Sequence, residues 1–569
     1  MTRGLQFTYL SSIILLLSVD SSGFQDGANP REESFRILSE WAHPDGREDH
    51  VPEKCGLPVL SAAINNRASL SPVLRTSLQT LLVRPSLDTS IRIGNYRIHF
   101  DTSASSANTP AMLDGSYNRI PGSYREFVDS TAAILTFVAS YDTSVLGYLP
   151  PPTDNGFGGG PEYDIYLVEL GGSYYGVTTP ETPINNKPDG GTFTTYMEID
   201  NDFNFVFPDS NKGLPALRVT LAHELHHAIQ LGNYGYWTGD VYFYEITSVW
   251  MEDVVYTDVN DYYQYLGTSQ GQFRRPDIPF TSNNFIVYSR GIWGQFIAKR
   301  FGRDVMRRAW EEIRDARPLL AMDNALQEVT SSFRQSFSEW SLWNFFTGTR
   351  DDTTGRYYPE GSFYPLMSQT PVSFSPPSRA VAGSLNALAA KYYQVLGGPD
   401  TLTLILSNTN FAAGLANSNV QFPYTYLLNI NRVDDSYKST PAGIFFKLDA
   451  PDLTNWFTWD VVRNGVGGSG ANAIGGACFP NPFLVDGKTR LRIPITSTVL
   501  TTGTLYVFTS SMDLVYSSEL TSRQQFAGQQ AFEWNGTTNN GEIVQTGVYF
   551  YTVDVQGQTA MGKIVVVRK

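Results

Sequence analysis

Apolar and polar residues follow a helical spacing near the start of the chain and a mixed spacing further on. Before residue 90, SFRILSEWA and SPVLRTSLQTLLV repeat their apolar positions every three to four residues, which predicts helices. From residue 91, the stretches IRIGNYRIHF, YDIYLVEL and TFTTYMEID alternate as strands do. Helical patterns lie between and after these strands, so this part is predicted to be an α+β domain.

After about residue 350 the helical patterns mostly stop. Short alternating runs such as TLTLILSN and GIFFKLDA predict a β-sandwich, and further alternating strands joined by Asn/Gly turns predict a second one in the final hundred residues. The predicted boundaries are a signal peptide at 1–23, an N-terminal extension or pro-segment at 24–90, an α+β domain at 91–350, a linker at 351–384, a β-sandwich at 385–463, a hinge at 464–475 and a C-terminal β-domain at 476–569.

The first 23 residues have the layout of a secretory signal peptide. Arg3 precedes an apolar stretch centred on Ile13 to Leu17, and small polar residues follow. This stretch is too short for a comfortable membrane span, and no other long apolar run occurs. The mature chain is therefore predicted to be exported and to lack a transmembrane segment.

Composition narrows the classes of partner. The net charge of −14 argues against nucleic acid, because phosphate binding needs a basic face. Only two cysteines, Cys55 and Cys478, occur in 569 residues, so this is no disulfide scaffold. The two cysteines form either one long-range bridge or two free thiols.

The stretch LAHELHHAIQLG, residues 221–232, holds three of the six histidines of the chain. Pro215 before it and Gly232 at its end predict that it lies on a helix. On a helix, His223 and His227 lie on one face and direct two imidazoles to one point, a spacing that suits Zn²⁺. Glu224 is placed to act as general base on a water that the metal activates. His226 points elsewhere and is predicted to support the site or lie at the surface.

Catalytic zinc takes three protein ligands and keeps one open position. No histidine follows His227, so a third ligand downstream must be a carboxylate. Glu245, in the helical stretch YEITSVWMED, is the candidate, and Glu252 two turns further on the same face is the fallback. The alternative for Glu245 is a solvent-facing position at a helix start, where the helix dipole favours an acid.

The H-E-x-x-H motif, followed by Glu245 and then by Glu252 seven residues later, resembles the gluzincin zinc peptidases. In aminopeptidase-type members the second helix reads E-G-x-A-x-[YFW]-x-E, and here Ile246 replaces the glycine. The G-x-M-E-N motif of exopeptidases is absent from the sequence, which favours an endopeptidase. The resemblance implies a second group that stabilises the oxyanion, and Tyr288 matches the tyrosine before a downstream helix in those members.

Three further stretches are candidates for binding a substrate or a metal ion. An edge strand, YDIYLVEL or TFTTYMEID, is expected to bind an extended substrate by main-chain pairing. The sequence PEKCGLPV around Cys55 resembles the cysteine-switch pro-segments of matrix metallopeptidases, in which a thiolate takes the open zinc position. The alternatives for Cys55 are a disulfide with Cys478 and a buried free thiol. The acidic run at 200–211 is either a Ca²⁺ site or a solvated turn.

The last ninety residues resemble the C-terminal sorting domains of type IX secretion cargo and the related FlgD-like immunoglobulin modules. The matching features are PNPF at 480–483, WNG at 534–536, NG at 540–541, GVYFY at 547–551 and the terminal GKIVVVRK. The resemblance implies that the partner of this domain is the secretion machinery of a Gram-negative bacterium, which releases the chain or attaches it to the cell surface. A generic stalk or adhesion domain is the alternative.

These patterns together predict a multidomain chain, in which a gluzincin-like α+β zinc peptidase domain precedes two all-β, immunoglobulin-like sandwich domains. The predicted function is that of a secreted zinc-dependent endopeptidase acting on protein or peptide substrates. One alternative is a surface or adhesion protein that keeps the metal domain as a scaffold. Another is a protease specific for glycosylated proteins, which exposed aromatic platforms on residues 385–463 would favour.

Overall fold

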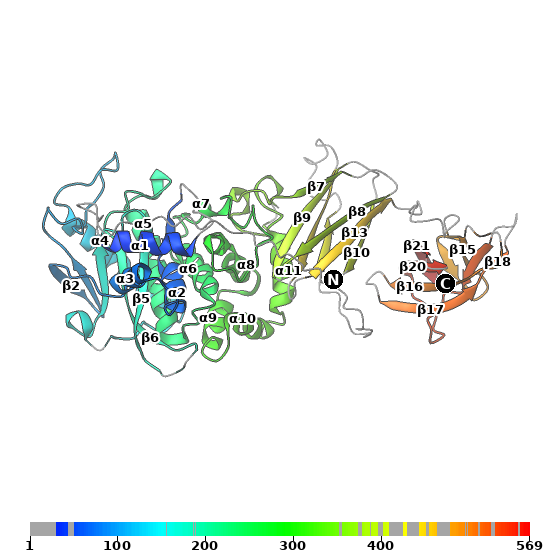
Figure 1. Cartoon of the computed structure of the whole chain (residues 1–569), viewed down its shortest axis with the longest axis horizontal. Helices are drawn as coiled ribbons and strands as arrows, with labels where there is room; N and C mark the ends of the chain where they lie inside the picture. Colours follow the sequence, from blue (N-terminus) through cyan, green and yellow to red (C-terminus); the bar gives the residue numbers. More distant parts are fainter. Residues whose placement is uncertain are drawn as a thin grey trace, which may run out of the picture. The chain divides into compact units, whose positions relative to one another are not determined.

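Figure 1 shows the computed structural model of the chain. The structure describes residues 30–43, 51–373 (without 155, 186, 188 and 352–354), the strands between 378 and 463, and 478–568 without the short gaps 496, 498, 510–512, 525–529 and 556–557. The chain forms two compact units: Met1–Val241 with Met251–Asp261, and Tyr242–Trp250 with Tyr262–Lys569. The predicted signal peptide and the predicted hinge lie outside the described residues.

A six-stranded mixed sheet is the centre of the first unit. Its strand order is β1-β5-β6-β4-β3-β2, and β3, β4 and β6 run parallel to one another. The strands are β1 (Glu53–Cys55), β2 (Thr89–Ile93), β3 (Tyr96–Phe100), β4 (Tyr163–Val168), β5 (Tyr174–Pro183) and β6 (Phe193–Asp200). All six residues of β4 are buried, as expected for a strand that is covered on both faces.

Two sequence-based predictions about this sheet were wrong. Residues 91–100 form the hairpin β2–β3 instead of one strand, because Gly94 takes a left-handed φ of 56° and turns the chain. The strands expected at a substrate-binding edge, β4 and β6, lie inside the sheet. The edge strand next to β5 is the three-residue β1, which pairs with β5 in parallel.

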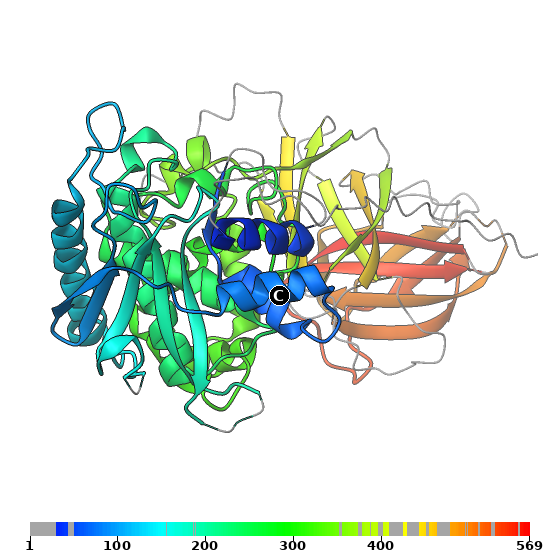
Figure 2. The same ribbon diagram turned by 60° about the vertical axis from the view of Figure 1, so that its left-hand side comes forward.

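The N-terminal segment packs on this sheet and shares a core with it. Its helices are α1 (Pro30–Ala42), α2 (Leu57–Asn65) and α3 (Pro72–Leu81), drawn in blue in Figure 2. Their residues Phe35 and Leu60 belong to the same buried cluster as Tyr174 and Tyr196 from the strands. Arg31 of α1, which is partly buried, also forms an ion pair with the buried Glu198 of β6.

Helix α5 (Leu214–Ile229) carries the histidines and is buried along nearly its whole length, beside α4 (Tyr124–Ser140) and the strands β5 and β6. The predicted end at Gly232 was wrong. A π-helical turn continues the helix from Gln230 to Tyr234, and Gly235, with a φ of 123°, ends it. Gly232 serves another purpose, because an added Cβ there would lie 2.3 Å from Cδ of Pro152.

The chain passes between the two units within α6 (Val241–Val255). The helical part of the second unit has a core of large aromatic side chains, among them Phe280, Trp293, Trp310 and Trp340. Its helices are α7 (Tyr263–Leu266), α8 (Ile292–Phe301), α9 (Asp304–Glu312), α10 (Pro318–Gln327) and α11 (Phe333–Trp343), and the short helix η5 (Phe285–Arg290) precedes α8.

The rest of the chain is β-structure, as the alternating pattern predicts. One region has the sheets β10-β13-β8 and β11-β12-β9-β7, made of β7 (Thr370–Ser373), β8 (Ser378–Leu385), β9 (Ala389–Leu396), β10 (Leu402–Asn408), β11 (Thr425–Asn429), β12 (Gly443–Ala450) and β13 (Asn455–Arg463). Strands β7 and β8 fall in the stretch predicted as a linker, and their pairing with β9 and β13 makes them part of these sheets.

The C-terminal region also has two sheets, β14-β21-β20-β16-β17 and β15-β19-β18. Trp534, Phe483 and Tyr551 lie in the buried cluster between its strands. The strands are β14 (Phe483–Val485), β15 (Leu491–Ile495), β16 (Thr502–Thr509), β17 (Leu514–Thr521), β18 (Arg523–Gln524), β19 (Gln530–Trp534), β20 (Gly547–Val555) and β21 (Gln558–Arg568).

The close approach of α5 to β5 makes a testable prediction. A Cβ at Gly176 of β5 would lie 3.0 Å from the Glu198 carbonyl oxygen, from Cγ of Glu224 and from Cγ2 of Thr220. We expect Gly176→Ala to lower the free energy of unfolding by about 1–3 kcal/mol in urea titrations, because helix and strand must move apart. Gly115→Ala is the control, since nothing lies within 4 Å of its Cβ. Equal effects of the two substitutions would contradict this prediction.

Candidate metal centre

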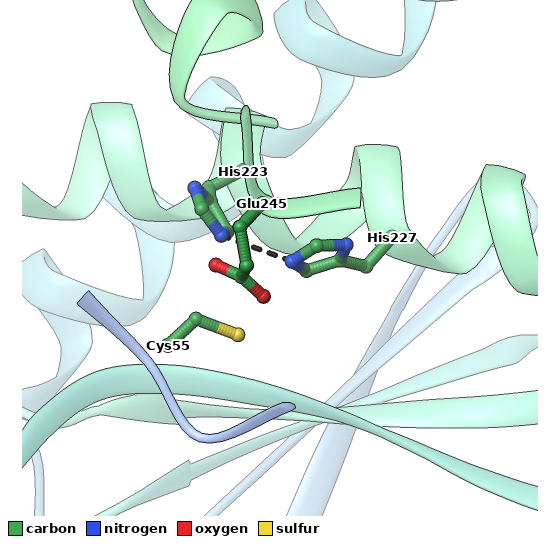
Figure 3. Close-up of side chains that lie close together, drawn as sticks. All are labelled: Cys55, His223, His227 and Glu245. Carbon is green, nitrogen blue, oxygen red and sulfur yellow. Dashed lines mark hydrogen bonds between the residues drawn. The ribbon is translucent and has the colours of Figure 1, made fainter. Parts of the chain in front are cut away.

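Four side chains with metal-binding atoms converge in the structure. The donor atoms of Cys55, His223, His227 and Glu245 all lie within 4.8 Å of one another, and all four residues are buried. Figure 3 shows the two imidazoles, the carboxylate and the thiol turned toward a common point. Among the described residues, this is the one group of histidine, cysteine and acidic side chains with such convergence. The structure therefore brings together the two histidines of the motif, the preferred third ligand and the cysteine of the N-terminal segment.

Hydrogen bonds at the far side of each imidazole fix how the two histidines point. His223 donates from Nδ1 to Oε1 of Glu252, at 2.8 Å. His227 donates from Nδ1 to Oε1 of Gln230, also at 2.8 Å. With the hydrogen on Nδ1, the Nε2 atom of each neutral ring keeps a bare lone pair. The two Nε2 atoms face each other at 3.0 Å.

Two lone pairs this close repel each other unless a cation lies between them, so the arrangement fits a metal. Two imidazoles and one carboxylate are a donor set that zinc accepts in catalytic sites, and thiolate is among its preferred ligands. The Nδ1 partners are typical of zinc-binding histidines, which usually donate their other N–H to an oxygen atom. His223, His227 and Glu245 would hold the ion, with Cys55 at the fourth position.

Glu224 lies next to this group and is completely buried. Thr178 of β5 donates a hydrogen bond of 2.7 Å to its Oε2, and the Cys55 thiol is hydrogen-bonded to the same carboxylate. Burial raises the pKa of Glu224 above its ordinary value, although His227, His223 and these hydrogen bonds lower it in part. A carboxylate with a raised pKa is better suited to accept a proton than an ordinary surface acid is.

His226 is a buried residue, so the alternative that placed it at the surface was wrong. Its Nδ1 accepts a 2.8 Å hydrogen bond from Nε2 of Gln230, and its ring meets Tyr148 edge-on. Burial lowers the pKa of His226 well below its ordinary value, and His227 and His223 lower it further. Gln230 thus links a neutral His226 to His227, and it holds the His227 ring in place.

Glu252, the fallback ligand, lies outside the group of four and supports His223 instead. It also forms a buried ion pair of 2.9 Å with Lys54, which precedes Cys55 in the chain. Lys54 forms a second buried ion pair with Asp261. Burial lowers the pKa of Lys54, but the attraction of Asp261 and Glu252 outweighs burial and the net pKa is raised, so Lys54 is a cation.

Tyr288, expected to stabilise an oxyanion, lies in η5 of the second unit and is buried. Its ring lies 5.4 Å from that of Tyr265 and 5.5 Å from that of Phe285. These contacts suit a packing role, and an oxyanion role for Tyr288 stays a prediction.

The acidic run at 200–211 begins with a turn. Asp200 accepts backbone hydrogen bonds from Asp202 and Phe203, and Asp202 forms an ion pair with Arg119. Within the described part of the chain, these acids do not belong to the group of convergent ligands. Their carboxylates have protein partners, which favours the turn over the Ca²⁺ site.

Cys55 and Cys478 are both free and buried, which excludes the disulfide between them in this structure. Sequence reasoning missed Thr178, Gln230 and Lys54 as parts of the site. Gln230 carried a signal, because it lies three residues after His227, where the next helical turn brings its amide beside the ring. Thr178 and Lys54 are far from the motif in sequence, and no local pattern indicates them.

Comparisons with known proteins identify the C-terminal region. Residues 483–560 match the model of the FlgD Ig-like domain. That match fits the two sheets and the shared core of β14–β21. The α+β part therefore precedes a β-region whose C-terminal domain is of FlgD Ig-like type. No curated protein matches the chain.

Two solved structures from Porphyromonas gingivalis share short regions with the chain. One is PorZ, described as an essential bacterial surface component of the type-IX secretion system, with 21% sequence identity over 19% of this chain and 14% of that one, and a TM-score of 0.13. The other is dimeric latent PorU, with 15% identity over 31% of this chain and 22% of that one, and a TM-score of 0.14. The matched regions span less than a quarter of either protein.

The geometry predicts how the metal affinity depends on Glu252. We expect Glu252→Gln to weaken Zn²⁺ binding by about 10- to 100-fold in chelator competition, because an amide is a poorer acceptor for Nδ1 of His223. Glu40→Gln is the control, since its side chain is 61% exposed on α1. Unchanged affinity in Glu252→Gln would show that this hydrogen bond does not orient the ligand.

Proposed function

We propose that this chain is a secreted zinc-dependent endopeptidase of the gluzincin type, folded in a latent form. The observation that carries the proposal is the convergence of His223, His227 and Glu245, with Glu224 beside them. The spacing of these residues along the sequence supports the same ligand set. A zinc ion held there would supply Lewis acidity to polarise the scissile carbonyl and to acidify water.

The residues of the chain would then do the following. The Glu224 carboxylate accepts a proton from the attacking water and delivers it to the leaving amine. Thr178 donates a hydrogen bond to Oε2 of Glu224 and would hold the carboxylate in place for this proton transfer. Glu252 and Gln230 keep the two imidazoles in the orientation that peptide hydrolysis needs.

The latent state follows from the place of Cys55. Its thiol belongs to the ligand group, and as a fourth ligand it would replace the water that the reaction needs. The backbone N–H of Leu57, at the start of α2, donates to the Cys55 sulfur at 3.3 Å and helps to hold the sulfur beside the histidines. Strand β1 also covers β5 at the edge where an extended substrate would pair.

The alternatives are weaker on the present observations. A surface or adhesion protein that kept the metal only as a scaffold would not need Glu224, which is present and held by Thr178. A protease for glycosylated proteins would be favoured by exposed aromatic side chains on residues 385–463. Most side chains of that stretch lie outside the described residues.

The FlgD Ig-like domain supports a place outside the cytoplasm. Its sequence features resemble sorting domains of type IX cargo, so we propose export across the outer membrane of a Gram-negative bacterium, with release or attachment at the cell surface. None of the helices in the described ranges combines the length and the apolar character that a bilayer crossing needs.

Hydrolysis and latency are tested with three variants of the full chain. We expect Cys55→Ala to hydrolyse casein at least tenfold faster than the unchanged chain, because the thiol no longer fills the fourth position. Adding Glu224→Ala should abolish this activity while one zinc per chain remains. Cys478→Ala is the matched control and should stay latent, since its thiol lies in the C-terminal core.

Zinc content and casein hydrolysis are measured side by side for each chain. Zinc in every variant without hydrolysis in any would favour the scaffold alternative. Hydrolysis by Cys55→Ala that persists in the Glu224→Ala background would show that another group is the base.

Secretion makes a separate prediction. In a Gram-negative host with a type IX system, we expect deletion of residues 478–569 to leave the chain in the periplasm, where immunoblots of cell fractions will detect it. The full chain with Glu224→Ala is the control and should reach the cell surface or the medium. Normal export of the chain that lacks residues 478–569 would favour the alternative that this region is a generic stalk or adhesion domain.

A further inference from the structure

The Lys54 ammonium group lies in a buried site that suits a cation. This site, formed by Asp261, Glu252 and Tyr175, is called the seat below. Lys54 is buried, with 1% of its side chain exposed. Its Nζ forms ion pairs with Asp261 and Glu252 and lies 4.5 Å from the centre of the Tyr175 ring. Two carboxylates and an aromatic face are the partners that an alkylammonium ion prefers.

None of the groups that form this seat comes from the segment that carries Lys54. Tyr175 lies on β5, Glu252 on α6, and Asp261 follows that helix. Asp261 is held by Asn211, whose Nδ2 donates at 3.0 Å, and Glu252 is held by Nδ1 of His223 at 2.8 Å. The seat is therefore fixed by the body of the first unit and would remain if residues 51–56 moved away.

An empty seat would leave two buried carboxylates without their cation, which is unfavourable in the protein interior. A cation must then replace Lys54, or the carboxylates must become hydrated. Glu252 also binds His223, so a cation in the seat lies next to the metal centre. Lys54 is adjacent in the chain to Cys55, whose thiol lies within 4.8 Å of the donor atoms of His223, His227 and Glu245.

We propose that this seat is a substrate subsite for a basic side chain, with lysine preferred, at a position next to the scissile bond. While the segment around Cys55 covers the centre, Lys54 occupies this subsite in place of a substrate side chain. The inference rests on the proposed function, since it names the class of substrate for that peptidase. The seat accepts a point charge from three directions, which suits an ammonium group better than a planar guanidinium.

The first arm of the test measures specificity. Cys55→Ala/Lys54→Ala frees both the fourth ligand position and the seat, and Lys54→Met keeps the side-chain volume if the alanine variant fails to fold. Peptide pairs differ only by lysine or norleucine at each position flanking the cleaved bond. We expect kcat/KM for lysine to exceed that for norleucine by at least about tenfold at one of these positions. A ratio near one at every position overturns the subsite and leaves the peptidase standing.

Charge variants show whether the seat causes the preference. Asp261→Asn in the same background should bring the ratio of lysine to norleucine close to one. Asp258→Asn is the matched control, because its side chain is 74% exposed, and the ratio should be unchanged. A preference that survives Asp261→Asn would assign it to another part of the cleft and overturn the inference.

The second arm does not depend on hydrolysis. In the full chain with Lys54→Ala, millimolar n-butylammonium should raise the Tm, whereas n-butanol of the same length should not. Adding Asp261→Asn should remove the effect. If no variant cleaves any peptide, the proposed function fails while this arm still reports on the seat. Absence of stabilisation by n-butylammonium would then overturn the cation site as well.

Discussion

The hydrogen bonds at Nδ1 of His223 and His227 are the constraint on which the centre depends. These bonds keep the hydrogen of each imidazole on Nδ1, on the side away from the centre. The Nε2 atom of each ring then directs its lone pair toward the centre. The partners come from different places: Gln230 lies on the same helix as the histidines, and Glu252 lies on α6. The position of α6 beside α5 is thus linked directly to the chemistry of the site, since a small shift would turn the His223 ring.

The same constraint explains why buried charge is concentrated around β1. Glu252 orients His223 and also needs a cation, and Lys54 supplies it. Asp261 shares that cation. Removing either partner of such a buried pair is more costly than an exposed pair would suggest, because the remaining charge is left in a poorly solvated place. The N-terminal segment is therefore part of the electrostatics of the centre as well as a cover over it.

The sequence was sufficient where the information is local. The spacing of His223, Glu224 and His227 requires only one helix, and Glu245 follows on the next long helix, so both could be predicted. The contacts of Lys54 with Asp261 join positions 207 residues apart, and no periodicity reports such a pair. The sheet order was missed for the same reason. Strand β1 has three residues, too few for an alternating pattern, and it reaches the edge of the sheet only through tertiary packing.

The shared core of α1–α3 and the sheet limits how the centre can be opened. Phe35, Leu60 and Leu78 are buried with residues of the strands, so loss of residues 30–90 as one block would expose a large apolar face to water. The buried Glu198 would also lose Arg31, its ion-pair partner. Under the proposed latent state, opening would then be local: residues 51–56 would leave the edge of β5, while the flanking helices stay where they are. The N-terminal segment is thus an integral part of the fold of the first unit, and within it only the short stretch around β1 can separate from the sheet without exposing that shared core.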